Sequence, residues 1–447
     1  MAMNGLTISD RTRDNAAHLA AAADQSPHYV RSITEAGEQS EVIAQDDIYA
    51  SNGMKLIAKG AKIDRSTWHR LADHKLRAPL DMMLVAADSV NEVSLARDID
   101  RIIAADPILS TLLVRSGDPQ SLKSILGQTT LQTPVAFRLT VMRNDRSRLY
   151  EHSLRVAVIA HSIGTRMKFS TAQLQHLLLA SLCHDFGEMH TDPDMLAPDR
   201  AIVGTDRRFI YVHPITGYVV LQQMNGIPAE VMQAVLQHHE RLDGSGYPYG
   251  DSADRISPLA RVISVAETFE AVVRRFNAVR LNITFRLNQG RLDNAAINAL
   301  YELLPGQVDA SNDGTCDYDY GPILAQLHRL LVDWPALRDE IERNKENEPL
   351  RFLTDRMLAI QSVVYQAGLT PELLEFLDLE AGDAEVLQEL NPTLDEIERL
   401  LSDIAHETDR KITKDSPCYA TAARVLDLLQ PEASSENNAG LMKSLAA

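Results

Sequence analysis

The sequence has 447 residues, of which 45% are hydrophobic and 24% are charged, and its formal net charge is -18 at pH 7. This length exceeds one compact core and predicts about two to four domains, while the negative charge excludes a general surface for nucleic acids or anionic membranes. The three cysteines have no paired spacing, which favours a reducing compartment over a disulfide scaffold.

The N-terminal segment, residues 1–40, is expected to be a mobile arm, because it is polar and alanine-rich without a sustained period. It lacks the apolar core of a signal peptide, and no apolar run in the chain approaches the roughly 20 residues that a membrane-spanning helix needs. We therefore expect a cytoplasmic protein. Residues 41–130 form the next predicted domain, in which Asn52-Gly53 indicates a β-hairpin that is followed by helices.

The pattern of residues 131–308 predicts a domain of successive helices that carry nearly all the residues capable of chemistry. The first of these helices is expected to end at Gly164, and its apolar face, at steps of three and four, includes His152. His161 lies about half a turn away from that face and is expected to point to solvent. A single histidine on an apolar face is more often a packed core residue than a metal ligand, so His152 alone decides nothing.

The next helix is expected to begin after Ser170, because Gln173 follows three residues later and completes a capping box. It is expected to end at His184-Asp185. Two ionisable groups at the end of an apolar helix are costly unless a partner neutralises them. A divalent cation is one such partner, and a hydrogen bond between the two side chains is the other.

Three further segments continue this series of polar residues on apolar helices. His213 precedes Pro214, which is expected to start a helix, and a later helix leads to the adjacent histidines His238 and His239. The last helix carries Glu267 on the flank of its buried stripe, where it is either a ligand or a glutamate that reaches solvent.

In chain order these positions supply five histidines and two acids. Nitrogen and oxygen donors without thiolate favour iron, manganese or zinc. The donors exceed what one ion needs, so we expect two ions with a bridging carboxylate. Such a pair activates water and clamps the attacking and leaving oxygens of a displacement at phosphorus, which predicts phosphoester hydrolysis.

The stretch from His152 to about Leu304 resembles the HD-GYP family, the branch of HD-domain phosphohydrolases that degrades cyclic di-GMP. The motifs that carry the resemblance are LCHDFGE, YVHPITG, HHERLDGSGYP and LARVISVAETFEAV, in the family's order and at about its spacing. The resemblance implies a mainly α protein with an all-helical HD-type bundle as its core. A small β-containing N-terminal region precedes this core, and extra helices, residues 309–447, follow it.

The resemblance also implies a role for each ligand position. One metal would be held by His152, His184, Asp185 and Glu267, and a second by His213, His238 and His239, with Asp185 bridging. A hydroxide between the two ions would hydrolyse cyclic di-GMP to pGpG, with GMP as a further product. Iron or manganese is expected, and zinc is the alternative.

Three features depart from the family pattern: the usual RPY segment after the last ligand helix reads RRFNAVRLN, and two single positions also differ. Glu188 replaces a lysine that contacts the phosphate, and Glu267 replaces an aspartate. Asp185 and Glu188 are the predicted catalytic residues. The predicted substrate contacts are Arg207, Arg208, Gly244 and Tyr247. The two arginines either compensate for the lost positive charge or are solvated surface residues, and the surface role is the more common one for arginine.

These departures leave two alternatives open. One is a catalytically weak relay that binds metal or cyclic di-GMP and signals through flanking domains. The other is a phosphohydrolase that acts on another nucleotide. The expected partners are cyclic di-GMP, a diguanylate cyclase or other signalling protein at the signature loop, and a second copy of the chain; nucleic acids and membranes are not expected.

Overall fold

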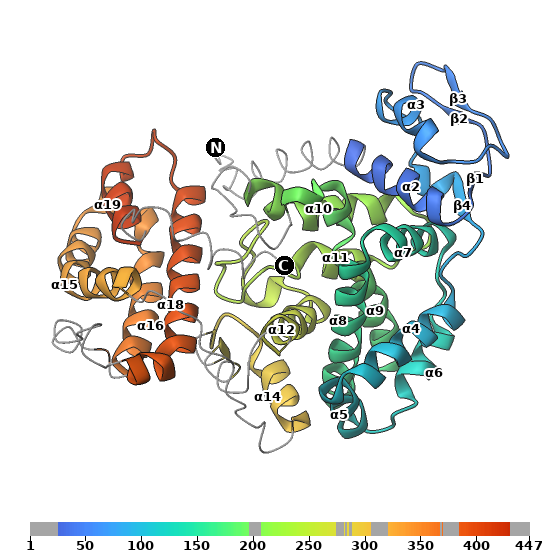
Figure 1. Ribbon diagram of the computed structural model, residues 1–447. Coiled ribbons are helices and arrows are strands. Elements are labelled where there is room, and N and C mark those ends of the chain that lie inside the picture. The colour runs from blue at the N-terminus through green and yellow to red at the C-terminus, as the bar shows by residue number, and fades with distance from the viewer. Residues whose placement is uncertain are drawn as a thin grey trace, which may run out of the picture. The chain divides into compact units, whose positions relative to one another are not determined.

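The computed structural model describes residues 26–195, 207–273, 281, 284–285, 288–304, 321–366, 369 and 384–429. These residues are mainly helical, with short strands near the N-terminal end, which confirms the predicted fold class (Figure 1). The chain divides into two compact units. The first holds the described residues up to 271 together with 290–304, and the second holds those between 272 and 289 and from 321 onward. The domain boundaries at residues 40, 130 and 308 stay predictions.

Helix α2 (Pro27–Gln39) corrects the prediction of a mobile arm that reaches residue 40. Its residues Tyr29, Val30 and Ile33 are buried, and the helix packs against α7 (Thr133–Asp145). The buried stripe of α2 is too short for its period to stand out in the sequence, and the packing against α7 is what orders it. The rest of the predicted arm, residues 1–25, lies outside the described residues.

The strands confirm the predicted hairpin. Strand β2 (Ile48–Tyr49) pairs antiparallel with β3 (Lys55–Ile57), and Gly53 in the intervening turn has a φ of 88°, which glycine adopts without strain. A second antiparallel pair joins β1 (Val42–Ala44) to β4 (Leu84–Ala86). Short helical segments fill the connection between β3 and β4: η1 (Arg65–Thr67), α3 (Trp68–Ala72) and η2 (Leu80–Met82).

The core of the first unit is built around helix α8 (Ser147–Arg166). Helices from both sides of α8 in the sequence pack against it, which buries it on nearly every side. The helices of this bundle, besides α7 and α8, are α4 (Glu92–Ala105), α5 (Pro107–Ser116), α6 (Ser121–Gln128), α9 (Thr171–Cys183) and α14 (Asn294–Leu303).

The central position of α8 overturns two predictions. His161 is 1% exposed and does not face solvent, because a helix surrounded by other helices has no solvent side. Gly164 does not end the helix, which continues to Arg166. A Cβ at Gly164 would lie 2.8 Å from Cδ2 of Leu177, so this glycine lets α8 approach α9 closely. The capping box at the start of α9 is confirmed, since Ser170 Oγ accepts from the backbone N–H of Gln173.

Three helices complete the region around the candidate site: α10 (Arg207–Gln223), α11 (Ala229–Gln237) and α12 (Pro258–Val273). Pro214 lies inside α10 and does not start it, which corrects the prediction. The proline pattern typical of a first helical turn fails here because the preceding residues are already helical. Short turns connect these helices: η3 (Phe186–His190), η4 (Pro193–Met195) and η5 (Ala253–Arg255).

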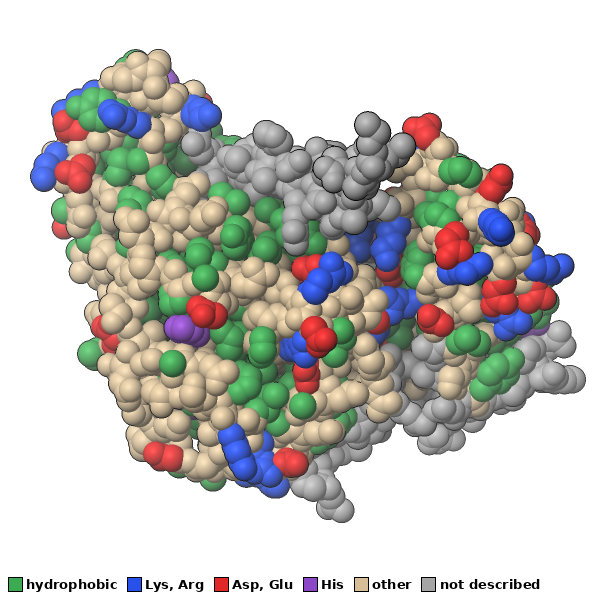
Figure 2. Space-filling view, turned by 180° about the vertical axis from the view of Figure 1, so that it is seen from behind, with side chains coloured by type: hydrophobic (Ala, Val, Ile, Leu, Met, Phe, Trp, Pro, Cys, Tyr) green, Lys and Arg blue, Asp and Glu red, His purple; other side chains and the backbone are tan. Residues whose placement is uncertain are grey.

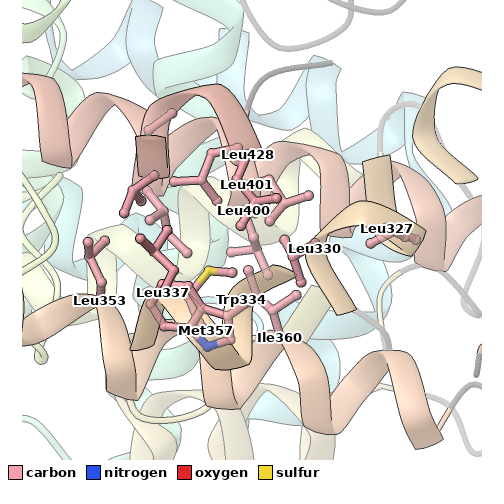
Figure 3. Packing of buried hydrophobic residues seen from close by; sticks show 14 of the residues in the cluster. Leu327, Leu330, Trp334, Leu337, Leu353, Met357, Ile360, Leu400, Leu401 and Leu428 are labelled. Carbon is pink, nitrogen blue, oxygen red and sulfur yellow. The ribbon is translucent and has the colours of Figure 1, made fainter. Parts of the chain in front are cut away.

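The second unit has a hydrophobic core of its own, centred on Trp334 (Figure 3). Trp334 is fully buried and lies near Met357 and Leu337 in that core. The elements that supply the core are α15 (Gly321–Arg343), η6 (Lys345–Leu350), α16 (Phe352–Gln366), α18 (Ala384–Lys411) and α19 (Tyr419–Leu429). The outer face of this unit shows acidic and basic side chains interspersed (Figure 2, right). Among all the described residues, no helix is long and apolar enough to cross a membrane.

Candidate metal centre

Two groups of histidine and aspartate side chains meet in the first unit. Within each group, one ligand atom from every residue lies within 4.8 Å of the others. The first group is His152, His184 and Asp185, and the second is Asp185, His213, His238 and His239. The sequence predicted all six of these residues as ligands, and the fold brings them together from α8, α10 and the C-terminal ends of α9 and α11.

Asp185 belongs to both groups and directs one carboxylate oxygen toward each. Its Oδ2 lies 3.0 Å from Nε2 of His184 and 3.6 Å from Nε2 of His152. Its Oδ1 lies 3.4 Å from Nε2 of His213 and 3.6 Å from Nε2 of His238. This is the arrangement of a carboxylate that can bridge two cations.

Hydrogen bonds on the far side of each ring determine which nitrogen faces the centre. The Nδ1 of His184 lies 2.8 Å from the carbonyl of Ser181, and His213 and His238 bond in the same way to the carbonyls three residues earlier, at 2.7 Å each. A carbonyl oxygen only accepts, so each Nδ1 carries the hydrogen. The Nε2 of each neutral ring therefore presents a lone pair to the centre.

The short distances between facing imidazole nitrogens indicate that this site can bind cations. Nε2 of His213 and Nε2 of His238 are 3.1 Å apart, and Nε2 of His184 and Nε2 of His152 are 3.3 Å apart. Two lone pairs cannot form a hydrogen bond with one another, so each pair needs a proton or a metal ion to satisfy it. Imidazole and carboxylate donors in this arrangement fit divalent transition metals. The residues present can thus hold metal ions.

Burial and neighbouring charges shift the pKa values of the clustered histidines in opposite directions. Burial opposes a charged His184, but the adjacent carboxylate of Asp185 raises the pKa of His184 to about 9. Burial and the neighbouring His238 hold the pKa of His239 well below its usual value, and the pKa of His213 falls to about 3 through burial. Protonation is therefore favoured at His184, whereas burial keeps His213 and His239 as neutral imidazoles that can coordinate.

Glu267 does not join either group. Its Oε1 lies 3.6 Å from Nε2 of His239, and its Oε2 is buried without a hydrogen-bond partner among the described residues. The resemblance had implied that Glu267 completes the set of His152 and His184. Its side chain is one methylene longer than the aspartate of the family, and here it reaches the second group. An unpaired carboxylate oxygen beside a histidine cluster is a further donor for a cation.

Glu188 lies on η3, one turn beyond Asp185, and is half-buried. Burial and then the charge of Asp185 raise the pKa of Glu188 well above its usual value, and the charge of Glu267 adds to this effect. Arg146, whose side chain is mostly buried, offsets part of it. The environment of Glu188 therefore favours its neutral acid form.

The glycine-rich loop after His239 folds tightly against the centre. A Cβ at Gly246 would lie 2.4 Å from the carbonyl oxygen of His239, so only glycine fits there. Gly244 has a φ of 78°, which favours glycine. The ring of Tyr247 stacks on His239 with centroids 4.5 Å apart and an interplanar angle of 22°, and the rings of Tyr211 and His213 also lie beside it, at 4.5 Å and 6.3 Å. Tyr247 thus packs against a candidate ligand.

Arg207 and Arg208 begin α10, but their side chains lie outside the described part of the chain. Sequence reasoning missed Glu270, which is 3% exposed and lies 3.0 Å from Nδ1 of His152. A signal for it exists, because Glu270 is an acid three residues after Glu267 on a helix whose other buried residues are, apart from Ser264, apolar.

Comparisons with known proteins agree with this geometry. The HD domain family matches residues 140–286, which include every candidate ligand. A cyclic di-GMP phosphodiesterase of Pseudomonas aeruginosa is 33% identical over 126 residues, which are 28% of this chain and 30% of that protein. A 3'3'-cGAMP-specific phosphodiesterase of Vibrio cholerae is 27% identical over 159 residues, which are 34% of this chain and 37% of that protein.

The chain thus spans about a third of the length of these curated relatives. A solved HDG"Y"P protein from Bdellovibrio bacteriovorus is 16% identical, with a TM-score of 0.33 over 60% of this chain and 94% of that one. This TM-score is too low to support any argument about the fold.

Proposed function

We propose that the chain is an HD-GYP protein and a metal-dependent phosphodiesterase that hydrolyses cyclic di-GMP to pGpG, with GMP as a second product, because residues 140–286 match the HD domain family and carry the motifs that resemble HD-GYP proteins. The observation that carries the proposal is Asp185, whose two oxygens face two pairs of opposed imidazole nitrogens. A protein that only needs a packed core has no use for two sets of converging lone pairs. A centre for two cations explains both.

The proposed cofactors are two divalent ions, iron or manganese, with zinc as the alternative. When bound, they supply an activated water and clamp the attacking and leaving oxygens. We propose His152, His184 and Asp185 as ligands of one ion, and Asp185, His213, His238 and His239 as ligands of the other, with Glu267 completing the second set.

The proposed role of Glu188 is to protonate the leaving oxygen of the diester. An anion at this position would repel a phosphate, but the raised pKa of Glu188 favours an acid that donates a hydrogen bond. A general acid must hold its proton at the working pH, and burial and the charge of Asp185 support this role because they raise the pKa of Glu188. The substitution of a lysine by glutamate thereby preserves a donor at this position.

The remaining substrate contacts stay proposals. Gly244 and Tyr247 belong to the loop beside His239, and Tyr247 would act mainly by holding that ligand, since its ring stacks on it. Arg207 and Arg208 would bind the phosphates from the start of α10. A diguanylate cyclase at this loop, a homodimer and a cytoplasmic location are further proposals, and they rest on the family resemblance and the sequence alone.

A second substrate has support from a specific finding. One relative from Vibrio cholerae is named for 3'3'-cGAMP, so cyclic dinucleotides with one adenine are the second candidate. The ligand set acts on the phosphodiester and does not distinguish the bases. The choice between the two substrates therefore depends on residues outside the metal centre.

The test is hydrolysis by protein purified without oxygen and loaded with manganese or iron. Cyclic di-GMP and 3'3'-cGAMP are incubated separately, and the linear dinucleotides and mononucleotides are followed by chromatography. We expect pGpG from cyclic di-GMP, and its loss in Asp185→Asn, which keeps the shape of the side chain but removes the bridging charge. Two bound metals with no product from either substrate would contradict the proposal and favour a binding relay.

A further inference from the structure

We propose that Glu270 is a positioning residue that holds His152 in the orientation and tautomer needed to bind the first metal ion. Oε2 of Glu270 lies 3.0 Å from Nδ1 of His152, and the carboxylate is 3% exposed. A carboxylate accepts, so Nδ1 of His152 donates and Nε2 is left with its lone pair toward His184 and Asp185. The inference rests on the proposed metal centre but not on hydrolysis.

His152 is anchored differently from its neighbours. His184, His213 and His238 each bond to a carbonyl three residues earlier in their own segment, so local backbone geometry holds these rings. His152 lies in the middle of α8, and its Nδ1 bonds instead to a side chain of α12. The orientation of His152 thus depends on a tertiary contact.

A second contact fixes Glu270 itself. Nε of Arg155 donates to Oε1 of Glu270 at 3.0 Å, so both carboxylate oxygens are engaged. Arg155 also bonds to Asp106, which caps the N-terminus of α5 by accepting from the backbone of Ile108. The chain from Asp106 through Arg155 and Glu270 to His152 therefore joins three helices behind one ligand.

This arrangement predicts that the two metal ions respond unequally to changes at Glu270. His152 belongs to the first ligand group alone, whereas the second group draws on Asp185, His213, His238 and His239. Loss of a hydrogen bond behind a metal-binding histidine lowers metal affinity by about 10- to 100-fold. One equivalent of metal should weaken by that factor, and the other should not.

The experiment is a calorimetric titration of the metal-free full-length protein with Mn²⁺ alone, followed by electron paramagnetic resonance. Wild type is expected to bind two equivalents and to show the signal of coupled ions. Glu270→Gln keeps the shape but places an amide against Arg155, and it should weaken one equivalent by about 10- to 100-fold and abolish the coupled signal. Arg155→Lys, which leaves Glu270 in place, should weaken the same equivalent by a smaller factor.

The control is Glu302→Gln, because Glu302 pairs with Arg166 at the end of the same helix α8 but is exposed and remote from His152. It should bind both equivalents as wild type does. Equal weakening of both equivalents in Glu270→Gln, or wild-type binding of both by Glu270→Gln and Arg155→Lys, would overturn the inference. A wild-type chain that binds no Mn²⁺ would overturn it together with the proposed function, whereas selective loss without any phosphodiesterase activity would overturn the function alone.

Discussion

At the scale of single residues, the candidate metal centre depends on the hydrogen bonds that each histidine ring makes on the side away from Asp185. The backbone carbonyls of Ser181, Ile210 and Val235 each bind one imidazole N–H, and this determines which nitrogen faces Asp185. The surroundings of Glu188 also matter, because burial and the charge of Asp185 raise the pKa of its carboxyl group. Two predictions concern single side chains whose surroundings shift their pKa values, Glu188 and His161.

The first concerns Glu188 as the proton donor. Glu188→Gln keeps the volume and a hydrogen-bond donor but has no proton to release, so kcat for cyclic di-GMP should fall by about 100-fold or more while KM changes little. Glu188→Lys restores an ionisable donor and should recover part of kcat. Steady-state kinetics with manganese-loaded protein measure both, and an unchanged kcat in Glu188→Gln would rule out proton donation by this residue.

The second concerns His161, whose burial lowers its pKa from 6.5 to about 4. Below pH 6.5 the unfolded chain binds a proton here that the folded chain does not, so stability is complete above that pH and falls as the pH drops toward 4. The loss by pH 4 is about 3 kcal/mol in the free energy of unfolding. His161→Leu should remove this part of the pH dependence.

The measurement for His161 is urea unfolding of the wild type and the variant between pH 7 and pH 4. The difference between the two proteins cancels the contributions of all other titrating groups. His69→Leu changes an exposed histidine and serves as the control. Parallel curves for wild type and His161→Leu would show that His161 does not titrate in this range.

At the scale of secondary-structure elements, the centre depends on the close approach of η3 to α10. A Cβ at Gly187 would lie 2.0 Å from the carbonyl oxygen of His213 and 2.9 Å from the backbone nitrogen of Gly217. Both neighbours are backbone atoms and cannot turn aside. Gly187 therefore allows Asp185, just before η3, to lie close to His213 on α10.

Gly187→Ala should consequently separate Asp185 and His213, two of the candidate ligands of the second ion. We expect it to lower the free energy of unfolding by about 1–3 kcal/mol or more and to weaken metal binding. Gly127→Ala is the matched control, because a Cβ there meets nothing within 4 Å. Chemical unfolding and Mn²⁺ titration test both variants, and wild-type metal binding by Gly187→Ala would show that the approach of η3 to α10 is not required.

At the scale of the whole molecule, the candidate ligands and the second hydrophobic core belong to separate compact units. Every candidate ligand lies in the first unit, and the core around Trp334 belongs to the second. Metal binding and the stability of the second core should therefore vary independently.

Trp334→Ala tests this independence. It leaves a cavity in the second core and should lower the stability of that unit by about 3–5 kcal/mol while Mn²⁺ stoichiometry stays unchanged. Val332→Ala on the same helix changes an exposed residue and should alter stability by less than about 0.5 kcal/mol. Chemical unfolding followed by Mn²⁺ titration at low denaturant gives both quantities. Loss of metal from Trp334→Ala would show that the site depends on the second core.

Sequence patterns were sufficient to predict the helical class, the β-hairpin at Asn52-Gly53, and six candidate ligands that the fold brings together. These features leave local signals, because turn chemistry, capping and histidine beside aspartate on apolar helices are visible within a few residues. Predictions from local sequence patterns were wrong where the packing of other helices determines whether a residue is buried or where a helix ends. The burial of His161, the continuation of α8 past Gly164 and the ordering of α2 all follow from packing against other helices.

The side-chain contacts that hold the candidate ligands in place depend on the tertiary structure. That Glu267 reaches His239, and that Glu270 stands behind His152, depends on the rotation of α12 relative to α8 and α11, which no single segment encodes. The raised pKa of Glu188 has the same origin in part, since Asp185 is only three residues away in the sequence but burial and the charge of Glu267 depend on packing. The physical reason is that burial and electrostatic interaction act through space, whereas sequence patterns record only neighbours along the chain.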